Sequence, residues 1–422
     1  MTLPPTTRLL PRPYQPLFVH RPFRRLLPAL AASDLGDGMS VVAVAWLAVL
    51  IAPPGRTGLV VGAAVAAYAL PGAAGALLFG RWLRRLPAQR LMAADGLLRA
   101  VLLGCVPLAW AAGILHPALY VVLLAGSSVL HAWGSAGKYS LLAQMLPAEQ
   151  RLAANALVSS STSASVIVGP ALAGFLATVV SPAWIIGLDA LSFAVLAVQV
   201  GRLGEVAKAV PTAAPVDSGR SAAGLHVLRG QPELLGVLAV TWFFNFLYGP
   251  VEVALPLHVT DDLHSGAGLL GLYWTLFGAG AVLGALAAGA LRRLPLWPVI
   301  LGIVAGWGLT LVPFGLGVSA EVSLACFALG GLIYGPFTAL SFTLFQDRTP
   351  AALLTTVLAA RGAALLTASP VGTALGGPLT AAMGPRLVLG VSGIATLALA
   401  VVAAGARAWG MRRSAEPGRP AS

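Results

Sequence analysis

The chain has 422 residues, of which 58% are hydrophobic and 9% are charged. This small number of charged side chains cannot cover the surface of a soluble domain of this size. The composition therefore excludes a soluble globular protein and predicts an integral membrane protein. The formal net charge of +12 comes from Lys and Arg in short segments between apolar runs. This pattern favours contact with anionic lipid headgroups and gives no reason to expect nucleic acid as a partner.

Twelve apolar runs of bilayer-spanning length follow one another along the chain. A helix needs about 20 apolar residues to cross roughly 30 Å of hydrocarbon, so we expect each run to form one transmembrane helix of an all-α protein. The runs are Leu26–Ala52, Leu59–Gly80, Leu91–Leu115, Ala118–Leu146, Leu152–Val180, Ala183–Val200, Leu234–Val259, Gly266–Leu291, Trp297–Leu316, Val322–Phe345, Ala351–Met383 and Leu387–Trp409.

One long break divides these runs six and six. Its prolines and charged residues cannot form a core, so we expect a cytoplasmic linker there. The predicted parts are an N-terminal tail 1–25, a first six-helix bundle 26–200, the linker 201–233, a second six-helix bundle 234–409 and a C-terminal tail 410–422. The two bundles are 175 and 176 residues long.

A short motif recurs at the same place in both halves. GALLFGRWLRRLP, Gly75–Pro87, returns as GALAAGALRRLP, Gly284–Pro295, after the second run of each half. A duplication of this kind predicts two six-helix pseudo-repeats, an architecture of secondary transporters that bind their substrate near the midplane between the repeats.

The distribution of basic residues predicts the orientation. If both termini are cytoplasmic, 21 Lys and Arg lie on the cytoplasmic side outside the helices, against 2 on the opposite side. Positive charge concentrates on the cytoplasmic side of membrane proteins, so we expect both termini there.

The first apolar run carries two carboxylates, Asp34 and Asp37. Their spacing of three places them on one helix face, and Asp37 lies ~17 Å from Leu26 at ~1.5 Å per residue, close to the membrane midplane. A buried acid at that depth either binds a proton or cation that biases which side of the transporter is open, or holds helices together through a nearby donor. We favour the functional interpretation for Asp37, and less strongly for Asp34.

Glu252 lies in the seventh run between Pro250 and Pro256, where a broken helix would free backbone carbonyls beside the acid. It is either a second acid for a cation or substrate, or an acid that reaches interfacial water. Asn245 precedes it on the same run and either hydrogen-bonds substrate or a neighbouring helix, and we favour the helix.

Other polar residues inside the runs are candidates for ion pairs or cavity walls. Lys138 lies as deep as Asp34, so a buried ion pair between them is geometrically possible. Arg99 follows Asp95 by four residues, which favours a local pair within one helix.

Three further side chains in the runs admit two interpretations each. Arg361 either holds an anionic substrate or has a structural role, and we favour the structural role, as we do for Asp189. His131 is either a proton relay or a packing residue, and packing is favoured.

The chain contains no GxxxxGK[ST], HExxH or GxSxG motif, so nothing indicates an enzyme that hydrolyses ATP, peptides or esters. The group His258, Asp261, Asp262 and His264 matches no strong metal motif and is better explained as a solvated loop. We expect no cofactor and no metal.

From Phe23 to about Gly405 the chain resembles the major facilitator superfamily. Within it, the stretches FRRLLPALAASDLGDGMS, LPAEQRLAANAL and NFLYGPVEVALPLHV are similar to the efflux branch of macrolide-efflux proteins and enterobactin-type siderophore exporters. The resemblance implies the twelve-helix major facilitator fold and a cavity lined by the first, fourth, seventh and tenth helices.

Two family motifs are present in altered form. The fifth run resembles the antiporter motif GxxxGPxxGG at Ser165, Gly169, Pro170 and Gly174, with two glycines replaced by small residues. The loop after the second run keeps the arginines of the family's gating loop, Arg84 and Arg85, but lacks its acid. Arg292 and Arg293 occupy the corresponding loop of the second half.

The resemblance favours a transporter of the inner or plasma membrane that exports a small amphipathic molecule, a drug or siderophore, in exchange for protons. The coupling acids would be Asp37, Asp34 and Glu252. The expected partners are the substrate, protons and membrane lipid, and the protein would be a monomer. Two alternatives stay open: a lysophospholipid or other lipid flippase of the same fold, which needs no proton, and a membrane sensor or scaffold that does not transport.

Overall fold

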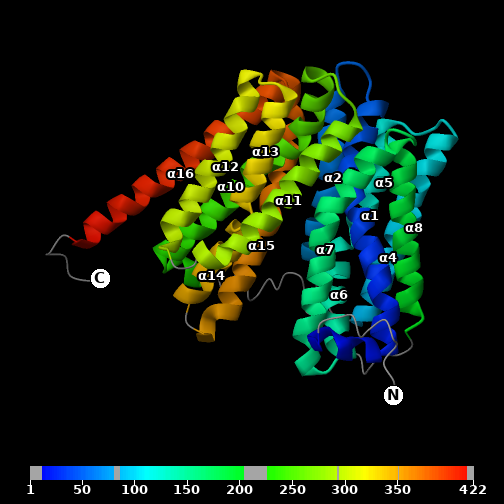
Figure 1. Ribbon diagram of the computed structural model, residues 1–422, viewed down its shortest axis with the longest axis horizontal. Helices are drawn as coiled ribbons and strands as arrows, with labels where there is room; N and C mark the ends of the chain where they lie inside the picture. The colour runs from blue at the N-terminus through cyan, green and yellow to red at the C-terminus, as the bar shows by residue number, and fades with distance from the viewer. Residues whose placement is uncertain (1–11, 80–85, 204–225, 292–293, 350, 416–422) are drawn as a thin grey trace. The chain divides into compact units, whose positions relative to one another are not determined.

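The computed structural model describes residues 12–79, 86–203, 226–291, 294–349 and 351–415, which are mainly α-helical (Figure 1). The helices of the first half are α1 Arg21–Ile51, α2 Thr57–Leu78, α4 Ala88–Ala111, α5 Pro117–Ser128, α6 His131–Met145, α7 Ala148–Leu176 and α8 Pro182–Gly201. Those of the second half are α10 Pro232–Leu257, α11 Ala267–Leu291, α12 Leu296–Leu316, α13 Ala320–Tyr334, α14 Phe337–Arg348, α15 Ala351–Met383 and α16 Pro385–Ala415. A 3₁₀ helix, Arg12–Val19, precedes α1, and a π-helical turn, His258–Asp262, extends α10.

These helices form the predicted twelve transmembrane segments. Among the described residues, 11 helical segments are long and apolar enough to cross a membrane, and α15, with 33 residues, completes the set. The fourth and tenth segments, Pro117–Met145 and Ala320–Arg348, are each interrupted, so α5 and α6 make up one and α13 and α14 the other. The chain is therefore a multi-pass membrane protein with the predicted twelve-helix fold.

Proline and glycine explain several helix boundaries. α1, α5, α8 and α10 have proline within their first two positions, where the missing N–H removes no helical hydrogen bond. α12 ends at Gly317, whose φ of 72° is accessible to glycine at low cost and lets its N–H donate to the carbonyl of Phe314.

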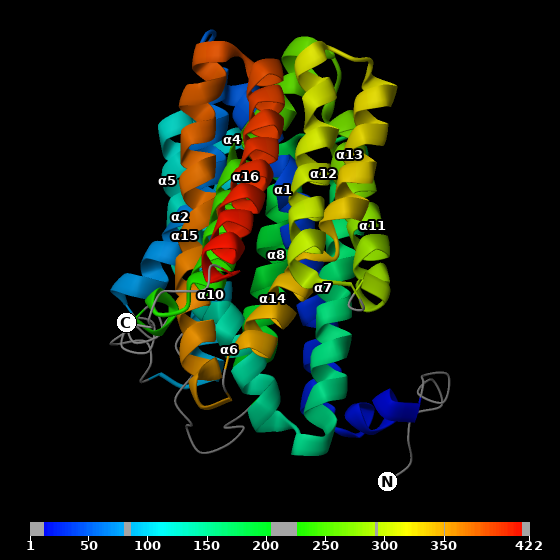
Figure 2. The same ribbon diagram turned by 90° about the vertical axis from the view of Figure 1, so that its left-hand side faces the viewer.

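The helices cluster into two compact units. The first comprises Met1–Ser218 with His264–Thr275, and the second comprises Gly219–Leu263 with Leu276–Ser422. In the first unit α1 packs on α7 and α8, and α4 packs on α8 (Figure 1). In the second unit α10 packs on α15 and α16, and α12 packs on α16 (Figure 2). The two units thus repeat one pairing scheme, as a duplicated chain requires.

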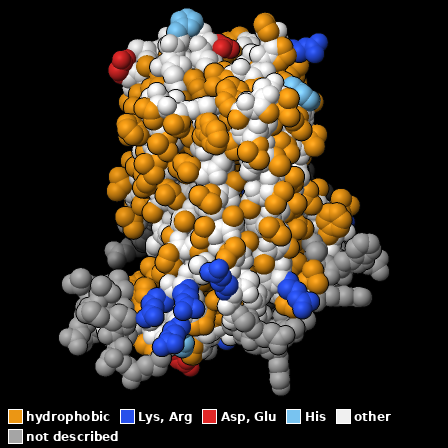
Figure 3. All heavy atoms as spheres, turned by 90° about the vertical axis from the view of Figure 1, so that its right-hand side faces the viewer, with side chains coloured by type: hydrophobic (Ala, Val, Ile, Leu, Met, Phe, Trp, Pro, Cys, Tyr) orange, Lys and Arg blue, Asp and Glu red, His pale blue; other side chains and the backbone are white. Residues whose placement is uncertain are grey.

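The outer surface matches a lipid environment. Figure 3 shows one face on which hydrophobic side chains form a wide band, with Lys and Arg side chains gathered toward one end. The exposed large apolar side chains of the first half include Leu97, Val101 and Leu108 on α4 and Leu188 and Leu191 on α8. An apolar surface this extensive is stable against lipid and not against water.

Most helix limits differ by a few residues from those predicted, and one expected break is absent. α1 begins at Arg21 because Pro22 starts a helix well, and α16 continues to Ala415, past the predicted end at Trp409. α10 runs unbroken through Pro250 and Pro256, so the expected break beside Glu252 is wrong. Proline is tolerated inside membrane helices where neighbouring groups can satisfy the carbonyls that it leaves unpaired.

Candidate functional site

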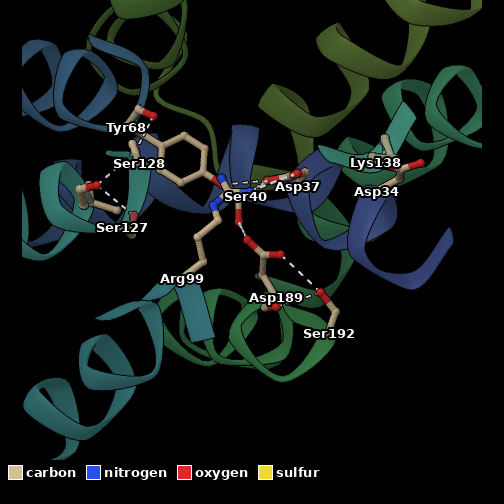
Figure 4. A network of polar contacts seen from close by, with 11 residues as sticks. Asp34, Asp37, Ser40, Tyr68, Arg99, Ser127, Ser128, Lys138, Asp189 and Ser192 are labelled. Atoms are coloured by element: carbon tan, nitrogen blue, oxygen red, sulfur yellow. Dashed lines mark hydrogen bonds and ion pairs between the residues drawn. The ribbon is translucent and has the colours of Figure 1, made fainter. Parts of the chain in front are cut away.

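The centre of α1 is built from Gly36, Asp37 and Gly38. Gly36 faces Asp189 and Ser192 of α8, while a Cβ atom on Gly38 would lie 3.0 Å from the carbonyl carbon of Ser165 on α7. The two glycines therefore let α8 and α7 approach α1 closely on two sides. Asp37 lies between them and extends in a third direction, toward α2 and α4 (Figure 4).

Asp37 forms an ion pair with Arg99 of α4. The Arg99 Nη1 atom lies 2.9 Å from Oδ1 and 3.2 Å from Oδ2 of the carboxylate. The Tyr68 hydroxyl on α2 donates to Asp37 Oδ1 at 2.9 Å and accepts from Arg99 Nη2 at 2.9 Å. Three helices that are separate in sequence thus meet at one charge-assisted triad, which we call the polar triad.

The two charges of the polar triad differ in exposure. The Arg99 side chain is 2% exposed, and its guanidinium lies 4.2 Å from the centre of the Phe193 ring. The Asp37 side chain is 33% exposed. A buried guanidinium that remains charged therefore holds an acid that other groups can still reach.

A second carboxylate, Asp189 of α8, lies next to the polar triad. It is fully buried, and its Oδ2 accepts the Ser40 hydroxyl at 2.6 Å. The Ser192 hydroxyl lies 3.5 Å from Oδ1. The shorter hydrogen bond of Ser192 goes to the backbone carbonyl of Asp189, at 2.7 Å, so Ser40 is the close donor to this carboxyl group.

A second ion pair connects α1 with α6. Lys138 Nζ lies 3.1 Å from Asp34 Oδ1, so the pair that the sequence allows is formed. The Thr162 hydroxyl of α7 donates to Asp34 Oδ2 at 2.9 Å. Both charged side chains are largely buried, with exposed fractions of 15% and 10%. This geometry links α1, α6 and α7.

A cavity of about 40 Å³ lies between the two ion pairs in the first unit. Its volume is enough for a water molecule. The polar and charged residues in its wall are Ser33, Asp34, Asp37, Asp95, Arg99, His131, Ser135 and Lys138. His131, predicted as either a relay or a packing residue, is therefore beside the charged groups.

In the second unit the predicted site residues Glu252, Asn245 and Arg361 each have a different hydrogen-bond partner. Glu252 Oε2 accepts the Thr373 hydroxyl of α15 at 3.0 Å. The Asn245 side-chain amide donates to the carbonyl of Thr241 at 2.8 Å. This partner lies on the same helix and not on a neighbouring helix as the sequence analysis favoured.

Arg361 of α15 is 8% exposed and donates to the Ser341 hydroxyl of α14 at 2.9 Å. Its guanidinium lies 5.1 Å from the centre of the Phe342 ring and 5.5 Å from that of Phe345. Hydrogen bonding and cation–π contacts thus join this arginine of α15 to α14.

The antiporter-like motif lies on one continuous helix, α7, that contains Pro170. The Ser165 hydroxyl donates to the carbonyl of Ser161, and Gly169 packs against Gly38. Gly174 packs against Gly271, which belongs to the same unit. Small residues at these positions thus allow close approach of helix backbones. The gating-loop arginines Arg84, Arg85, Arg292 and Arg293 lie outside the described residues.

Two sequence interpretations are wrong. Arg99 pairs with Asp37 across helices and not with Asp95, because a buried guanidinium binds the acid that approaches it best. The solvated-loop interpretation is wrong for His258, which is 2% exposed and has its Nδ1 atom 2.7 Å from Asp262 Oδ2, whereas Asp261 and His264 are exposed. Sequence reasoning also missed Tyr68, whose one available signal was a hydroxyl in the middle of an apolar run.

The described residues contain no group of three or more His, Cys, Asp or Glu side chains arranged to hold a metal ion. The chemistry of the first unit is therefore that of carboxyl, guanidinium and hydroxyl groups around a small cavity. Such an arrangement can bind, release and exchange protons, or contact a polar ligand group.

Two related helix bundles with charged groups inside one of them are an architecture of secondary membrane transporters. The family model of the Major Facilitator Superfamily matches residues 26–365, and the chain belongs to this superfamily. Its members and structural neighbours named below are transporters and not enzymes.

Two relatives are efflux proteins. The chain is 29% identical to the multidrug efflux pump Tap of Mycobacterium tuberculosis (strain ATCC 25618 / H37Rv) over 381 residues, which cover 85% of this chain and 87% of the relative. It is 26% identical to the enterobactin exporter EntS of Escherichia coli O1:K1 / APEC over 276 residues, 64% of this chain and 65% of the relative.

A solved structure supports the fold. The structure of a bacterial homologue of the iron transporter ferroportin in the inward-facing state matches with a TM-score of 0.70 and 19% identity, over 90% of this chain and 97% of the other. At this identity the likeness concerns the fold alone.

Proposed function

We propose that the chain is a secondary active transporter of the inner or plasma membrane that exports a small amphipathic molecule by alternating access in exchange for protons. Asp37 is its coupling acid, with Asp34 and Glu252 as further acids. The protein acts as a monomer with both termini in the cytoplasm.

The observation that carries this proposal is the polar triad. An acid in the middle of a membrane helix is costly unless it is paired, and such acids commonly mark the pathway of an ion or a substrate. Asp37 is one-third exposed while its partner Arg99 is buried. Protonation of Asp37 would cancel its charge and release Arg99, which gives a physical link between a proton and the packing of α1, α2 and α4.

The direction of transport is inferred from the relatives and from the α7 motif. Tap and EntS are an efflux pump and an exporter by name, and the antiporter-like residues permit tight packing of α1 on α7. Export of a drug-like or siderophore-like molecule is therefore the activity that these features favour.

The test is transport into inside-out proteoliposomes that contain the purified protein. Ethidium and enterobactin serve as separate probes, and the lumen is held either more acidic than the outside or at equal pH. We expect an acidic lumen to accelerate uptake of at least one probe, because protons leave in exchange. Asp37→Asn should abolish this acceleration while the protein stays folded.

Asp261→Asn is the matched control, since Asp261 is exposed beyond α10 and should leave uptake unchanged. Equal uptake with and without the pH gradient would contradict proton exchange. If lysophospholipid were also moved under those conditions, the lipid flippase would be the better description.

A further inference from the structure

Asp95 is a buried acid that the proposed function leaves unused. It lies on α4, is 7% exposed and borders the cavity of the first unit. Its Oδ1 atom has no hydrogen-bond partner among the described residues. Its carboxyl group contacts the backbone of α6 at Gly134, where a Cβ atom would collide with it.

The other acids of the first unit near Asp95 all have donors. Asp37 has Arg99 and Tyr68, Asp189 has Ser40, and Asp34 has Lys138. Asp95 and Arg99 are four residues apart on α4, so they lie on one face of the helix, close enough to interact electrostatically. His131 of α6 is the remaining titratable group in the cavity wall.

The charges around Arg99 do not balance if every acid is ionised. Lys138 and Asp34 cancel each other, which leaves one guanidinium for three acids: Asp37, Asp95 and the fully buried Asp189. An ionised carboxylate without a donor or counter-charge is strongly disfavoured in a buried site, whereas the neutral acid avoids that penalty. One guanidinium therefore supports one ionised acid. Asp189 has the Ser40 hydroxyl as a donor, whereas Asp95 Oδ1 has none among the described residues, so Asp95 is the acid that competes with Asp37.

We propose that Asp37 and Asp95 compete for Arg99, and that whichever acid is not paired with Arg99 carries the exchanged proton. In the structure described here Asp37 is paired, so Asp95 holds the proton on Oδ1. The inference rests on the proposed function, because it names a second carboxyl group for the same proton exchange.

The exchange step conserves charge and protons. The O–H bond at Asp95 Oδ1 breaks and an O–H bond forms on the Asp37 carboxylate, while the Arg99 guanidinium turns from Asp37 to Asp95. The cavity borders both acids and has room for a water molecule that passes the proton between them. No other reactant is needed.

The test is infrared difference spectroscopy of the purified protein, which detects the C=O stretch of protonated carboxyl groups and needs no substrate. Asp95→Asn should remove the signal of one protonated carboxyl relative to the unmodified chain. Asp37→Asn should also remove one, because the freed Arg99 then pairs with Asp95 and ionises it. Arg99→Gln should add one, because neither acid keeps its cation.

Asp95→Asn and Asp37→Asn are expected to lower the carboxyl signal, and Arg99→Gln is expected to raise it. An unchanged signal in Asp95→Asn would show that Asp95 carries no proton, and an unchanged signal in Asp37→Asn would show that the two acids do not compete. Either result would overturn the inference. If Asp95→Asn does not fold, the Asp37→Asn result still decides.

Glu252→Gln is the matched control from the second unit. The change that Asp95→Asn causes should be the same in the presence and in the absence of Glu252→Gln. Because the infrared signal is measured without transport, absence of the expected spectroscopic pattern would not contradict the proposal of proton-coupled export. If the spectroscopic pattern is observed but the pH gradient does not accelerate uptake into liposomes, proton-coupled transport is refuted, whereas competition of Asp37 and Asp95 for Arg99 is not.

Discussion

The polar triad of the first unit has an aromatic counterpart in the second. Asp37 follows Arg21, the first residue of α1, by 16 positions, and Tyr248 follows Pro232, the first residue of α10, by the same 16. Arg99 and Trp307 each follow the first residue of their helices, α4 and α12, by 11 positions.

The third members of the two groups also correspond. In the duplicated motif Gly75 matches Gly284, and Tyr68 and Phe277 each lie seven residues before these glycines. The ring centres of Tyr248 and Trp307 are 5.8 Å apart, and those of Phe277 and Trp307 are 5.4 Å apart. We call Tyr248, Phe277 and Trp307 the aromatic triad.

The surrounding framework is common to both units. Gly38 follows Asp37 and packs on Gly169 of α7, while Gly249 follows Tyr248 and packs near Gly372 of α15. The duplicated helices thus keep their backbone contacts, while both charged side chains are replaced by aromatic ones and Tyr68 by Phe277, which lacks the hydroxyl group. Charge is present at this position in one unit, and ring packing replaces it in the other.

The largest effect is expected from breaking the polar triad. Arg99→Leu leaves Asp37 without its cation, and loss of one partner of a buried pair costs about 3 kcal/mol or more. Adding Asp37→Asn should recover most of that loss, because no unpaired charge remains. Denaturant unfolding of the purified protein in detergent measures both. Full destabilisation in the double variant would mean that Arg99 acts through packing alone.

A smaller effect, equal in the two units, is expected at the glycines. Gly38→Ala and Gly249→Ala each place a methyl group against a neighbouring helix backbone, and overpacking of this kind costs about 1–3 kcal/mol. The same unfolding assay compares them, with Gly302→Ala as control because a Cβ there meets nothing within 4 Å. Strongly unequal losses would argue against a shared framework.

The aromatic triad should show weaker and pH-independent coupling. A double-mutant cycle of Tyr248→Leu and Trp307→Leu should give about 0.5–1.5 kcal/mol, the range for aromatic pairs. The value should be the same at acidic and alkaline pH, since no ion pair is involved. A pH-dependent coupling would mean that a charged group, such as Glu252 one helical turn from Tyr248, acts on the aromatic pair.

The smallest effect is expected at an exposed pair of the second unit. Arg348 Nη1 lies 2.7 Å from Glu233 Oε2, with side chains 53% and 38% exposed. Arg348→Gln should cost less than about 1 kcal/mol, and added salt should reduce the difference further. If Arg348→Gln lowered the free energy of unfolding as much as Arg99→Leu does, burial could not explain the difference between the two ion pairs.

Sequence reasoning was most successful where a single helix decides the outcome. Twelve segments followed from apolar length, and the repeated loop motif indicated the two pseudo-repeats. It was least successful for Arg99, because the spacing to Asp95 describes neighbours within a helix and says nothing of a neighbouring helix. The correspondence of Asp37 with Tyr248 emerged when the helix starts were known.

The amino-acid sequence by itself determined the membrane setting, the helix count and the duplication, because hydrophobic length and repeated motifs are properties of the chain. The partner of each buried charge was decided by the tertiary structure. Gly36 and Gly38 set how closely α8 and α7 approach α1. This approach decides which donor reaches Asp37 and leaves one carboxyl oxygen, Asp95 Oδ1, without a partner among the described residues.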